Sequence, residues 1–256
     1  MKRHFSIRGG GMSLVAILAL SLASLSLNPA SSAHAFSAPS APAIDITPRD
    51  VAASNEKVRM AHAALVAMWS ADFKQLGQTF AAPGLIPYYG GVRTRCGIVQ
   101  SSNAIYCPRD NTIYFDEVFV AAQAKTAARQ LGTDGDMAAV GIIAHEMGHA
   151  VSAQLGHVFE SGYANEATAD CLAGAFAQHA SRDGSLEDGD LDEAFFAMST
   201  AGDPTPELTG DRRTDRWILA RAAAMSHGTR EQRTQNFRTG LDGGPAACLP
   251  ELKGLH

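Results

Sequence analysis

The feature that most constrains this chain is a pair of histidines four residues apart, in the run Ala144-His145-Glu146-Met147-Gly148-His149. Apolar residues precede the run, and their spacing predicts a helix over 136–155. Residues four apart in a helix project from the same face, so the two imidazoles can share one metal ion with Glu146 beside them. Neutral imidazole nitrogens are ligands that zinc prefers. The motif therefore predicts a zinc site built on a helix.

A catalytic zinc ion usually has three protein ligands and one open position for water, so the histidine pair needs a third ligand. Glu166 and Asp170 lie near the start of a second helix, predicted over 163–181. Small residues in this helix would let it approach the histidine helix closely: Ala167, Ala169, Ala173, Gly174 and Ala175. We expect Glu166 to bind the metal and Asp170 to accept a hydrogen bond from the far nitrogen of a ligand histidine. The competing interpretation is an acidic helix face in contact with solvent.

Three other side chains fall within range of the histidine pair but fit a metal site less well. His157 does not fit the H-E-x-x-H-x-x-G-x-x-H pattern, because serine and leucine stand where that pattern needs glycine and histidine. Glu160 lies in the turn predicted between the two helices. His179 lies about 20 Å beyond Glu166 along an unbroken helix.

The rest of the chain also favours helices. Aromatic residues make up only 7% of the chain while alanine is abundant, which argues against a β-sandwich or barrel. Thr47, Pro48 and Asp50 form an N-cap pattern ahead of a helical stripe that ends near Leu76. Proline and glycine residues over 83–91 interrupt this pattern. Short strands are predicted over 97–100, 104–107 and 112–115, and further helices over 117–131, 136–155, 163–181, 189–200, 210–226 and 229–239. The expected fold class is α+β, predominantly helical, with a small β-sheet.

The first 35 residues have the three-part layout of a secretory signal peptide. Three basic residues precede an apolar stretch over 12–27, and the small residues Ala33-His34-Ala35 offer a cleavage site. We predict a signal peptide over 1–35, a flexible linker over 36–46 and a folded domain over 47–256, exported to the periplasm or the medium. In the alternative interpretation the segment is an uncleaved anchor, and only then would the protein contact a membrane.

Four cysteines lie beyond the predicted cleavage site: Cys96, Cys107, Cys171 and Cys248. An even number of cysteines in an exported chain predicts disulfides, and four cysteines allow three pairings. Pairing Cys96 with Cys107 is the most economical, because the two flank a short segment with strand-like residues. Cys171 and Cys248 would then close a long loop, and a disulfide that closes a longer loop stabilises the folded protein more.

The charge of the chain argues against a nucleic-acid partner. Lysine and arginine total 21 against 26 acidic residues, which gives a formal net charge of −5. No run of basic residues offers a footprint for a phosphate backbone. A composition of 46% hydrophobic and 18% charged residues suits one globular domain.

Taken together, these residues resemble the bacterial family of neutral zinc metallopeptidases. The resemblance runs through Cys107-Pro108-x-Asp110, Ile113-Tyr114-x-Asp116, Ala144-His145-Glu146-x-Gly148-His149 and Glu166-x-x-Ala169-Asp170-Cys171, and ends around Arg233, Phe237 and Gly240. It implies a zincin-like metallopeptidase domain with one Zn²⁺ ion per chain. It also implies His145, His149 and Glu166 as the zinc ligands and Glu146 as the catalytic base.

The expected function is hydrolysis of peptide bonds in a peptide or protein substrate. Glu146 would act as general base on a zinc-activated water. His227 matches the family's His-Gly step and would donate to the oxyanion, although a helix-end cap is the alternative role for it. The alternative function is that of a non-catalytic metal-binding or adaptor protein that keeps a zincin scaffold.

Overall fold

The computed structural model describes residues 44–203, 206–225 and 227–255, and of 223–225 only the backbone. The predicted signal peptide over 1–35 lies outside these ranges, as does the predicted linker over 36–46 except for its last three residues. Those three residues belong to neither a helix nor a strand. Among the described residues, no helix combines the length and the apolar character needed to cross a membrane.

The first helix, α1 (Pro48–Gln75), begins where the sequence predicts it. The Asp50 carboxylate accepts a hydrogen bond from the Thr47 N–H, and the Thr47 hydroxyl accepts one from the Asp50 N–H. This capping box satisfies N–H groups that the first turn leaves free. Buried side chains follow at helical spacing on one face: Val58, Ala61, Leu65, Met68, Trp69 and Phe73. This face packs against α2 (Glu117–Leu131) and α3 (Asp136–Gln154).

The part of the chain between α1 and α2 forms two small sheets. In the first, β5 (Thr112–Asp116) is the middle strand, with β1 (Gly84–Tyr88) parallel to it and β4 (Ala104–Cys107) antiparallel to it. All of β5 is buried, as its central position requires. The second sheet is a hairpin of β2 (Gly91–Thr94) and β3 (Gly97–Gln100).

The stretch over 83–91 differs from the sequence prediction. Its prolines and glycines predict an interruption of the helical pattern, which is confirmed because α1 ends at Gln75, but the structure also forms β1 and the start of β2 there, which the sequence did not predict. Pro87 is tolerated because β1 is an edge strand, so one side of its backbone makes no ladder hydrogen bonds. Gly90, with a φ of 74°, turns the chain between the two strands.

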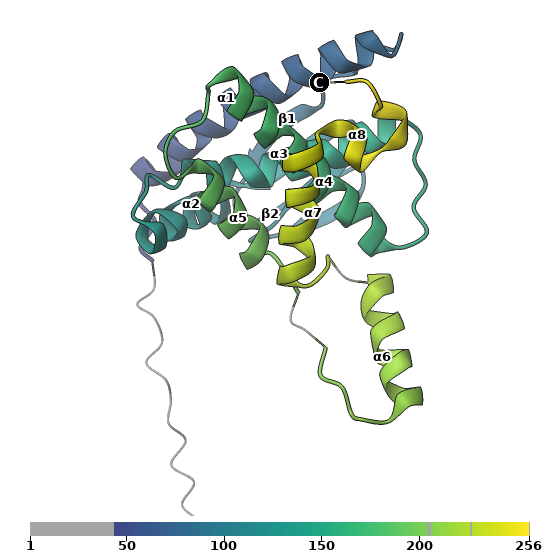
Figure 1. Ribbon diagram of the computed structural model, residues 1–256. Helices are drawn as coiled ribbons and strands as arrows, with labels where there is room; N and C mark the ends of the chain where they lie inside the picture. Colours follow the sequence, from purple (N-terminus) through teal and green to yellow (C-terminus); the bar gives the residue numbers. More distant parts are fainter. Residues whose placement is uncertain (1–43, 204–205, 226, 256) are drawn as a thin grey trace, which may run out of the picture. The chain divides into compact units, whose positions relative to one another are not determined.

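Several of the other helices pack around α3 (Figure 1). Most of α3 is buried, and it packs against α1, α2, α4 (Gly162–Asp183) and α5 (Asp190–Thr200). α4 also contacts α6 (Arg212–Met225) and α7 (Arg230–Gly243), and the described chain ends after the short helix α8 (Pro245–Cys248) and a 3-10 turn (Pro250–Leu252). The fold is therefore α+β and predominantly helical with a small mixed sheet, which confirms the predicted class.

Glycines let three of these helices approach one another closely. At Gly148 of α3, an added Cβ atom would lie 2.8 Å from the Ala169 carbonyl oxygen of α4. At Gly174 of α4 and Gly240 of α7, an added Cβ atom would overlap the backbone of the facing helix. These contacts set the spacing of α3, α4 and α7, which carry the residues of the candidate site.

Candidate metal centre

Helices α3 and α4 bring three side chains with metal-ligand chemistry together. His145 and His149 lie one turn apart on α3, and Glu166 lies in the first turns of α4. His145 Nε2 is 3.0 Å from Glu166 Oε2, and His149 Nε2 is 3.5 Å from Glu166 Oε1. The two Nε2 atoms are 3.1 Å apart. One ligand atom from each side chain lies within 4.8 Å of the other two. We call these three residues the metal cluster.

The Nδ1 atoms of both histidines, which point away from the metal cluster, have hydrogen-bond partners. His145 Nδ1 lies 2.7 Å from Asp170 Oδ1, and His149 Nδ1 lies 3.2 Å from Asn165 Oδ1. Both of these partner atoms are acceptors, and the Arg233 guanidinium also lies 3.1 Å from His145 Nδ1. With the proton on Nδ1, each neutral imidazole presents the lone pair of its Nε2 to the cluster. Two lone pairs and a carboxylate then face one another, an arrangement that a cation stabilises. Two imidazoles and a carboxylate fit zinc and leave one position for water.

A buried arginine completes the surroundings of His145. Arg233 of α7 is 4% exposed, and its Nε and Nη2 donate to the two oxygens of Asp170 at 3.0 and 2.6 Å. Its Nη1 donates to the Ala201 carbonyl at 3.1 Å. Asp170 is fully buried, so this two-pronged ion pair neutralises a charge that would otherwise be costly to bury. Asp170 therefore links Arg233 to His145.

The charges of the metal cluster shift its pKa values. Burial lowers the pKa of His145, as does Arg233, but Asp170 and Glu166 outweigh both and raise this pKa to about 9. Burial raises the pKa of Glu166, but hydrogen bonds with His145 and His149 outweigh burial and hold it far below its ordinary value. Both shifts favour a positive charge beside an ionised carboxylate, so a proton and a metal ion compete for the same place.

Glu146 lies beside the metal cluster and borders a cleft. It is 7% exposed, and its Oε2 accepts a hydrogen bond from the backbone N–H of Tyr106 in β4 at 2.7 Å. The cleft, of about 440 Å³, runs past Glu146 and His149 between the end of β4 and the loop that joins α3 to α4. Its walls include Tyr106, Pro108, His157, Phe159 and Asn165. An extended ligand could therefore reach the metal cluster along an edge strand.

His227 lies outside this cleft. Its side chain is 60% exposed, and within the described part of the chain no hydrogen bond joins it to the metal cluster. Its Nδ1 is 3.6 Å from the Asp203 carboxylate, which also accepts the His227 backbone N–H at 2.7 Å. The next residue, Gly228, packs against the ring of Tyr163, one turn before Glu166 on α4. Asp203 thus anchors His227 near the start of α4.

The three weaker candidates for the third ligand have other surroundings. His157 lines the cleft, but its Nε2 contacts the carboxylate of Glu251 near the C-terminus. His179 lies 3.8 Å from Asp183, one turn later in α4. Glu160 is exposed in the loop before α4. None of the three joins the group of ligand atoms that the structure brings together on α3 and α4.

A second group of carboxylates gathers at the N-terminal end of α3: Asp134, Asp136, Asp190 and Glu193. Glu193 is fully buried and accepts hydrogen bonds from the N–H groups of Gly135 and Met137, both at 2.8 Å. Asp136 forms an ion pair with Lys57. Glu193 therefore has a structural role, because it satisfies free N–H groups at the start of the helix that carries both histidines.

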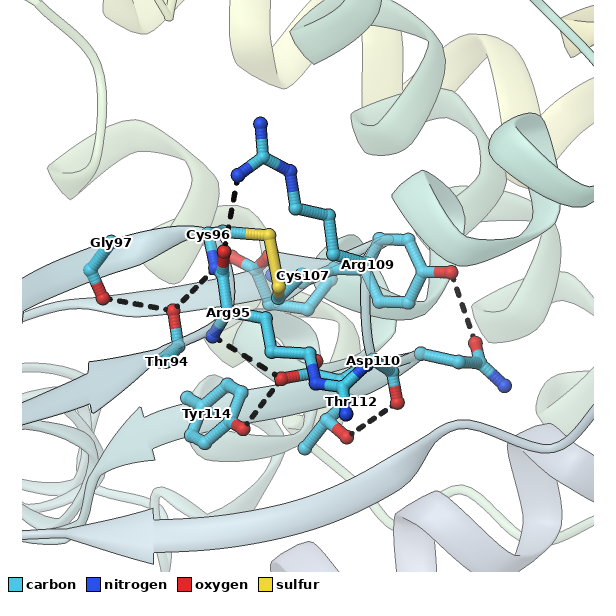
Figure 2. The surroundings of a disulfide bond; sticks show 12 residues. Thr94, Arg95, Cys96, Gly97, Cys107, Arg109, Asp110, Thr112 and Tyr114 are labelled. Carbon is cyan, nitrogen blue, oxygen red and sulfur yellow. Dashed lines mark hydrogen bonds between the residues drawn. A yellow bond between two sulfur atoms is a disulfide. The ribbon is translucent and has the colours of Figure 1, made fainter.

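The structure contains two disulfides, Cys96–Cys107 and Cys171–Cys248, which is the pairing expected from the spacing. Figure 2 shows the first, where the side chain of Asp110 accepts hydrogen bonds from the Tyr114 hydroxyl at 3.0 Å and from a backbone N–H of the hairpin. Cys107 follows Tyr106 in β4, and Cys171 follows Asp170 in α4. Both disulfides therefore fix backbone next to the candidate site. Disulfides are typical of proteins in oxidising compartments.

Three contributors to the site escape the sequence analysis. Asn165 directly precedes Glu166 and lies one helical turn before Ala169. Because Ala169 is one of the small residues expected to face α3, this spacing could have indicated that Asn165 faces α3 as well. Arg233 is named only within the family resemblance, without a role; it is 63 residues from Asp170, and no periodicity links two residues so far apart. Tyr106 contributes a backbone N–H, which every residue except proline has, so its side chain gives no signal.

A model of the family described as "Putative neutral zinc metallopeptidase" matches residues 6–249. The chain is 34% identical over 197 residues to the uncharacterized protein YpfJ of Escherichia coli K12. It is 30% identical over 203 residues to the uncharacterized protein Rv2575 of Mycobacterium tuberculosis H37Rv. Each match covers 70% of this chain and 65% of the length of the relative. No solved structure matches the chain. With the family's model matching nearly the whole sequence, the chain belongs to this family of zinc metallopeptidases.

Proposed function

We propose that this protein is an exported zinc-dependent metallopeptidase that hydrolyses peptide bonds in peptide or protein substrates. One zinc ion per chain would be held by His145, His149 and Glu166. The observation that carries the proposal is the convergence of two imidazole lone pairs and a carboxylate next to Glu146, at the side of an open cleft. A closed structural zinc site would have a fourth protein ligand in place of this opening.

Glu146 would perform the proton transfers. When bound, zinc would supply Lewis acidity that makes water more acidic and polarises the substrate carbonyl. Tyr106 N–H holds Glu146 Oε2, and in the described residues no hydrogen bond occupies Oε1. Glu146 can therefore accept a proton from the attacking water and then return it to the leaving amine nitrogen.

The edge of β4 would orient the substrate. The Tyr106 N–H points away from β5 toward Glu146, and in an antiparallel ladder the carbonyl of the same residue points to the same side. This carbonyl can bind the N–H of an extended peptide that lies in the cleft. The edge of β4 can therefore bind a substrate segment in extended conformation, such as an unfolded segment, but not a helix.

His227 would donate to the oxyanion that forms when water attacks the carbonyl. Two contacts support this role: Asp203 faces the His227 Nδ1, and Gly228 packs on Tyr163, which precedes Glu166 by one helical turn. A carboxylate at Nδ1 leaves Nε2 free to act on substrate. Because the imidazole is exposed, its Nε2 would make its contact with bound substrate and not with another part of the protein.

Export is supported by the two disulfides and by the layout of the first 35 residues. Removing 1–35 takes away three basic residues and no acid, so the mature chain would carry a net charge of (21 − 3) − 26 = −8. The cleavage site and the final compartment, periplasm or medium, belong to the proposal.

The test separates metal binding from turnover. Glu146→Gln should keep one zinc ion per chain by elemental analysis while losing hydrolysis of an unstructured protein such as casein. His145→Ala and Glu166→Ala should lose both zinc and hydrolysis, and Glu231→Gln, an exposed change on α7, should lose neither. Hydrolysis by Glu146→Gln at the wild-type rate would refute the assignment of the base. Zinc without hydrolysis in the wild-type protein would favour the non-catalytic alternative.

A further inference from the structure

Helix α6 lies apart from most of the other helices and has one half-buried face and one exposed face (Figure 1). Asp215, Ile218 and Ala222 are half-buried and recur three and four residues apart, and the helix packs against α4. On the other side Arg213, Trp217 and Arg221, four residues apart, are all exposed, with exposed Arg216 and Ala220 beside them. We call Arg213, Arg216, Trp217 and Arg221 the arginine–tryptophan face (Figure 1, helix α6).

This face carries positive charge that the described protein does not neutralise. α6 holds four arginines, Arg212, Arg213, Arg216 and Arg221, and none of them forms an ion pair with a described residue. The only acid in the helix, Asp215, lies on the other face and accepts hydrogen bonds from Thr209 and from the Gly210 N–H. The helix therefore has a net charge of 4 − 1 = +3 in a chain of net charge −5.

A large apolar side chain lies within this positive surface. Trp217 is 62% exposed, whereas the only other tryptophan, Trp69, is 1% exposed in the core. The guanidinium of Arg221 lies 5.6 Å from the centre of the Trp217 ring. Leu219, on the same helix, is 48% exposed. Such exposure of apolar area in water is unfavourable unless a partner covers it.

The chemistry of the face selects the partner. Arginine and tryptophan are both enriched in protein interfaces, but a protein partner would have to supply several carboxylates to match the arginines of this face, whereas an anionic lipid surface supplies a phosphate at every headgroup. Arginine binds phosphate oxygens in pairs, and tryptophan prefers the headgroup level of a bilayer. Both preferences are met together at the surface of a membrane that contains anionic lipid.

We propose that the arginine–tryptophan face of α6 binds the surface of membranes rich in anionic phospholipid. In this mode α6 lies on the bilayer with Trp217 at headgroup level and the arginines on lipid phosphates. The contact is made by the folded domain, so it persists whether or not the N-terminal segment is removed, in contrast to the expectation from the sequence that only an uncleaved segment would contact a membrane. It would hold an enzyme of net negative charge at a surface that would otherwise repel it.

The test uses Trp217 as its own reporter. The full chain is titrated with vesicles of phosphatidylcholine mixed with phosphatidylglycerol, and with vesicles of pure phosphatidylcholine. Because Trp69 is already buried, a shift of emission to shorter wavelength on anionic vesicles reports Trp217. The variant Arg213→Gln/Arg216→Gln/Arg221→Gln should bind anionic vesicles about 10- to 100-fold more weakly, and Trp217→Phe should lose the emission shift.

The matched control removes the same charge elsewhere. Arg59→Gln/Arg129→Gln/Arg182→Gln changes three exposed helical arginines outside α6 and should bind anionic vesicles within twofold of the wild-type protein. The apolar stretch over 12–27 is common to all variants, so any lipid affinity that it has cancels in the comparison. Equal losses in both triple variants, equal binding to both kinds of vesicle, or an unchanged Trp217 emission on anionic vesicles would overturn the proposal.

Discussion

At the scale of single residues, the buried ion pair between Arg233 and Asp170 controls how His145 is held. Arg233→Met leaves the Asp170 carboxylate buried without its partner, which should cost about 3–5 kcal/mol of the free energy of unfolding. Because Asp170 also accepts from His145, zinc affinity should fall about 10- to 100-fold. Urea unfolding measures the first effect, and competition with a chromophoric chelator measures the second.

Two further variants separate these effects of Arg233. Arg233→Lys keeps the charge but cannot bind both Asp170 oxygens at once, so its zinc affinity should lie between those of the wild type and Arg233→Met. Arg230→Met, on the exposed side of the same helix, should change neither quantity. Zinc affinity of a folded Arg233→Met protein within twofold of the wild type would contradict this account.

A second prediction at this scale concerns Asp72, a buried carboxyl group on α1. Burial raises the pKa of Asp72 from 3.8 to about 6, and its Oδ2 has no partner among the described atoms. The folded-state pKa lies above the unfolded one, so the stabilising effect is fully present below pH 3.8 and is lost as the pH rises through about 6. Asp72→Asn removes this loss, so it should add about 1–3 kcal/mol to the free energy of unfolding above pH 6 and almost nothing near pH 4.

Thermal unfolding of the Asp72→Asn protein across this pH range checks the sign. The control is Asp188→Asn, an exposed change whose effect should be small at every pH. An advantage of Asp72→Asn that grows toward acid pH would show that the buried carboxyl is stabilised in its charged form, contrary to the argument above.

At the scale of elements, the close approach of α3 to α4 creates the metal cluster. In Gly148→Ala, the new methyl group would lie 2.8 Å from the Ala169 carbonyl oxygen, so the two helices must separate. We expect a loss of about 1–3 kcal/mol in stability together with a fall in zinc affinity of at least about tenfold. The measurements are urea unfolding and chelator competition.

The same helix offers a matched control for this substitution. At Gly141 of α3, the nearest atom to an added Cβ is the Met198 methyl carbon at 3.6 Å, which is ordinary contact. Gly141→Ala should therefore keep zinc affinity and gain helix propensity, by up to about 1 kcal/mol. If both alanine variants bind zinc like the wild type, the spacing of α3 and α4 is not what forms the cluster.

Elements with local signals could be predicted from the sequence, and those with distant partners could not. The start of α1 follows from Thr47 and Asp50, three residues apart. The histidine pair on α3 follows from helix geometry alone. β1, in contrast, is set by parallel pairing of Gly84 with Thr112, which lies beyond three other strands, and its proline and glycine residues indicate the opposite of a strand.

At the scale of the whole molecule, the two disulfides should stabilise the fold unequally. Cys171–Cys248 has a sequence separation of 77 and ties α4 to the C-terminal α8, whereas Cys96–Cys107 has a separation of 11. The loop-closure model gives about 4.5 kcal/mol for the longer loop and about 2.8 kcal/mol for the shorter one. Cys171→Ala/Cys248→Ala should therefore lower the free energy of unfolding by more than Cys96→Ala/Cys107→Ala does.

Urea unfolding of the two double variants under oxidising conditions tests this order, with the wild-type protein in reducing buffer as the reference for losing both bonds. The loss in reducing buffer should approach the sum of the two separate losses, because the disulfides join different parts of the fold. Equal stability of the wild type in oxidising and reducing buffer would contradict the prediction. It would also remove the main structural support for export, since a chain that gains nothing from its disulfides has no need of an oxidising compartment.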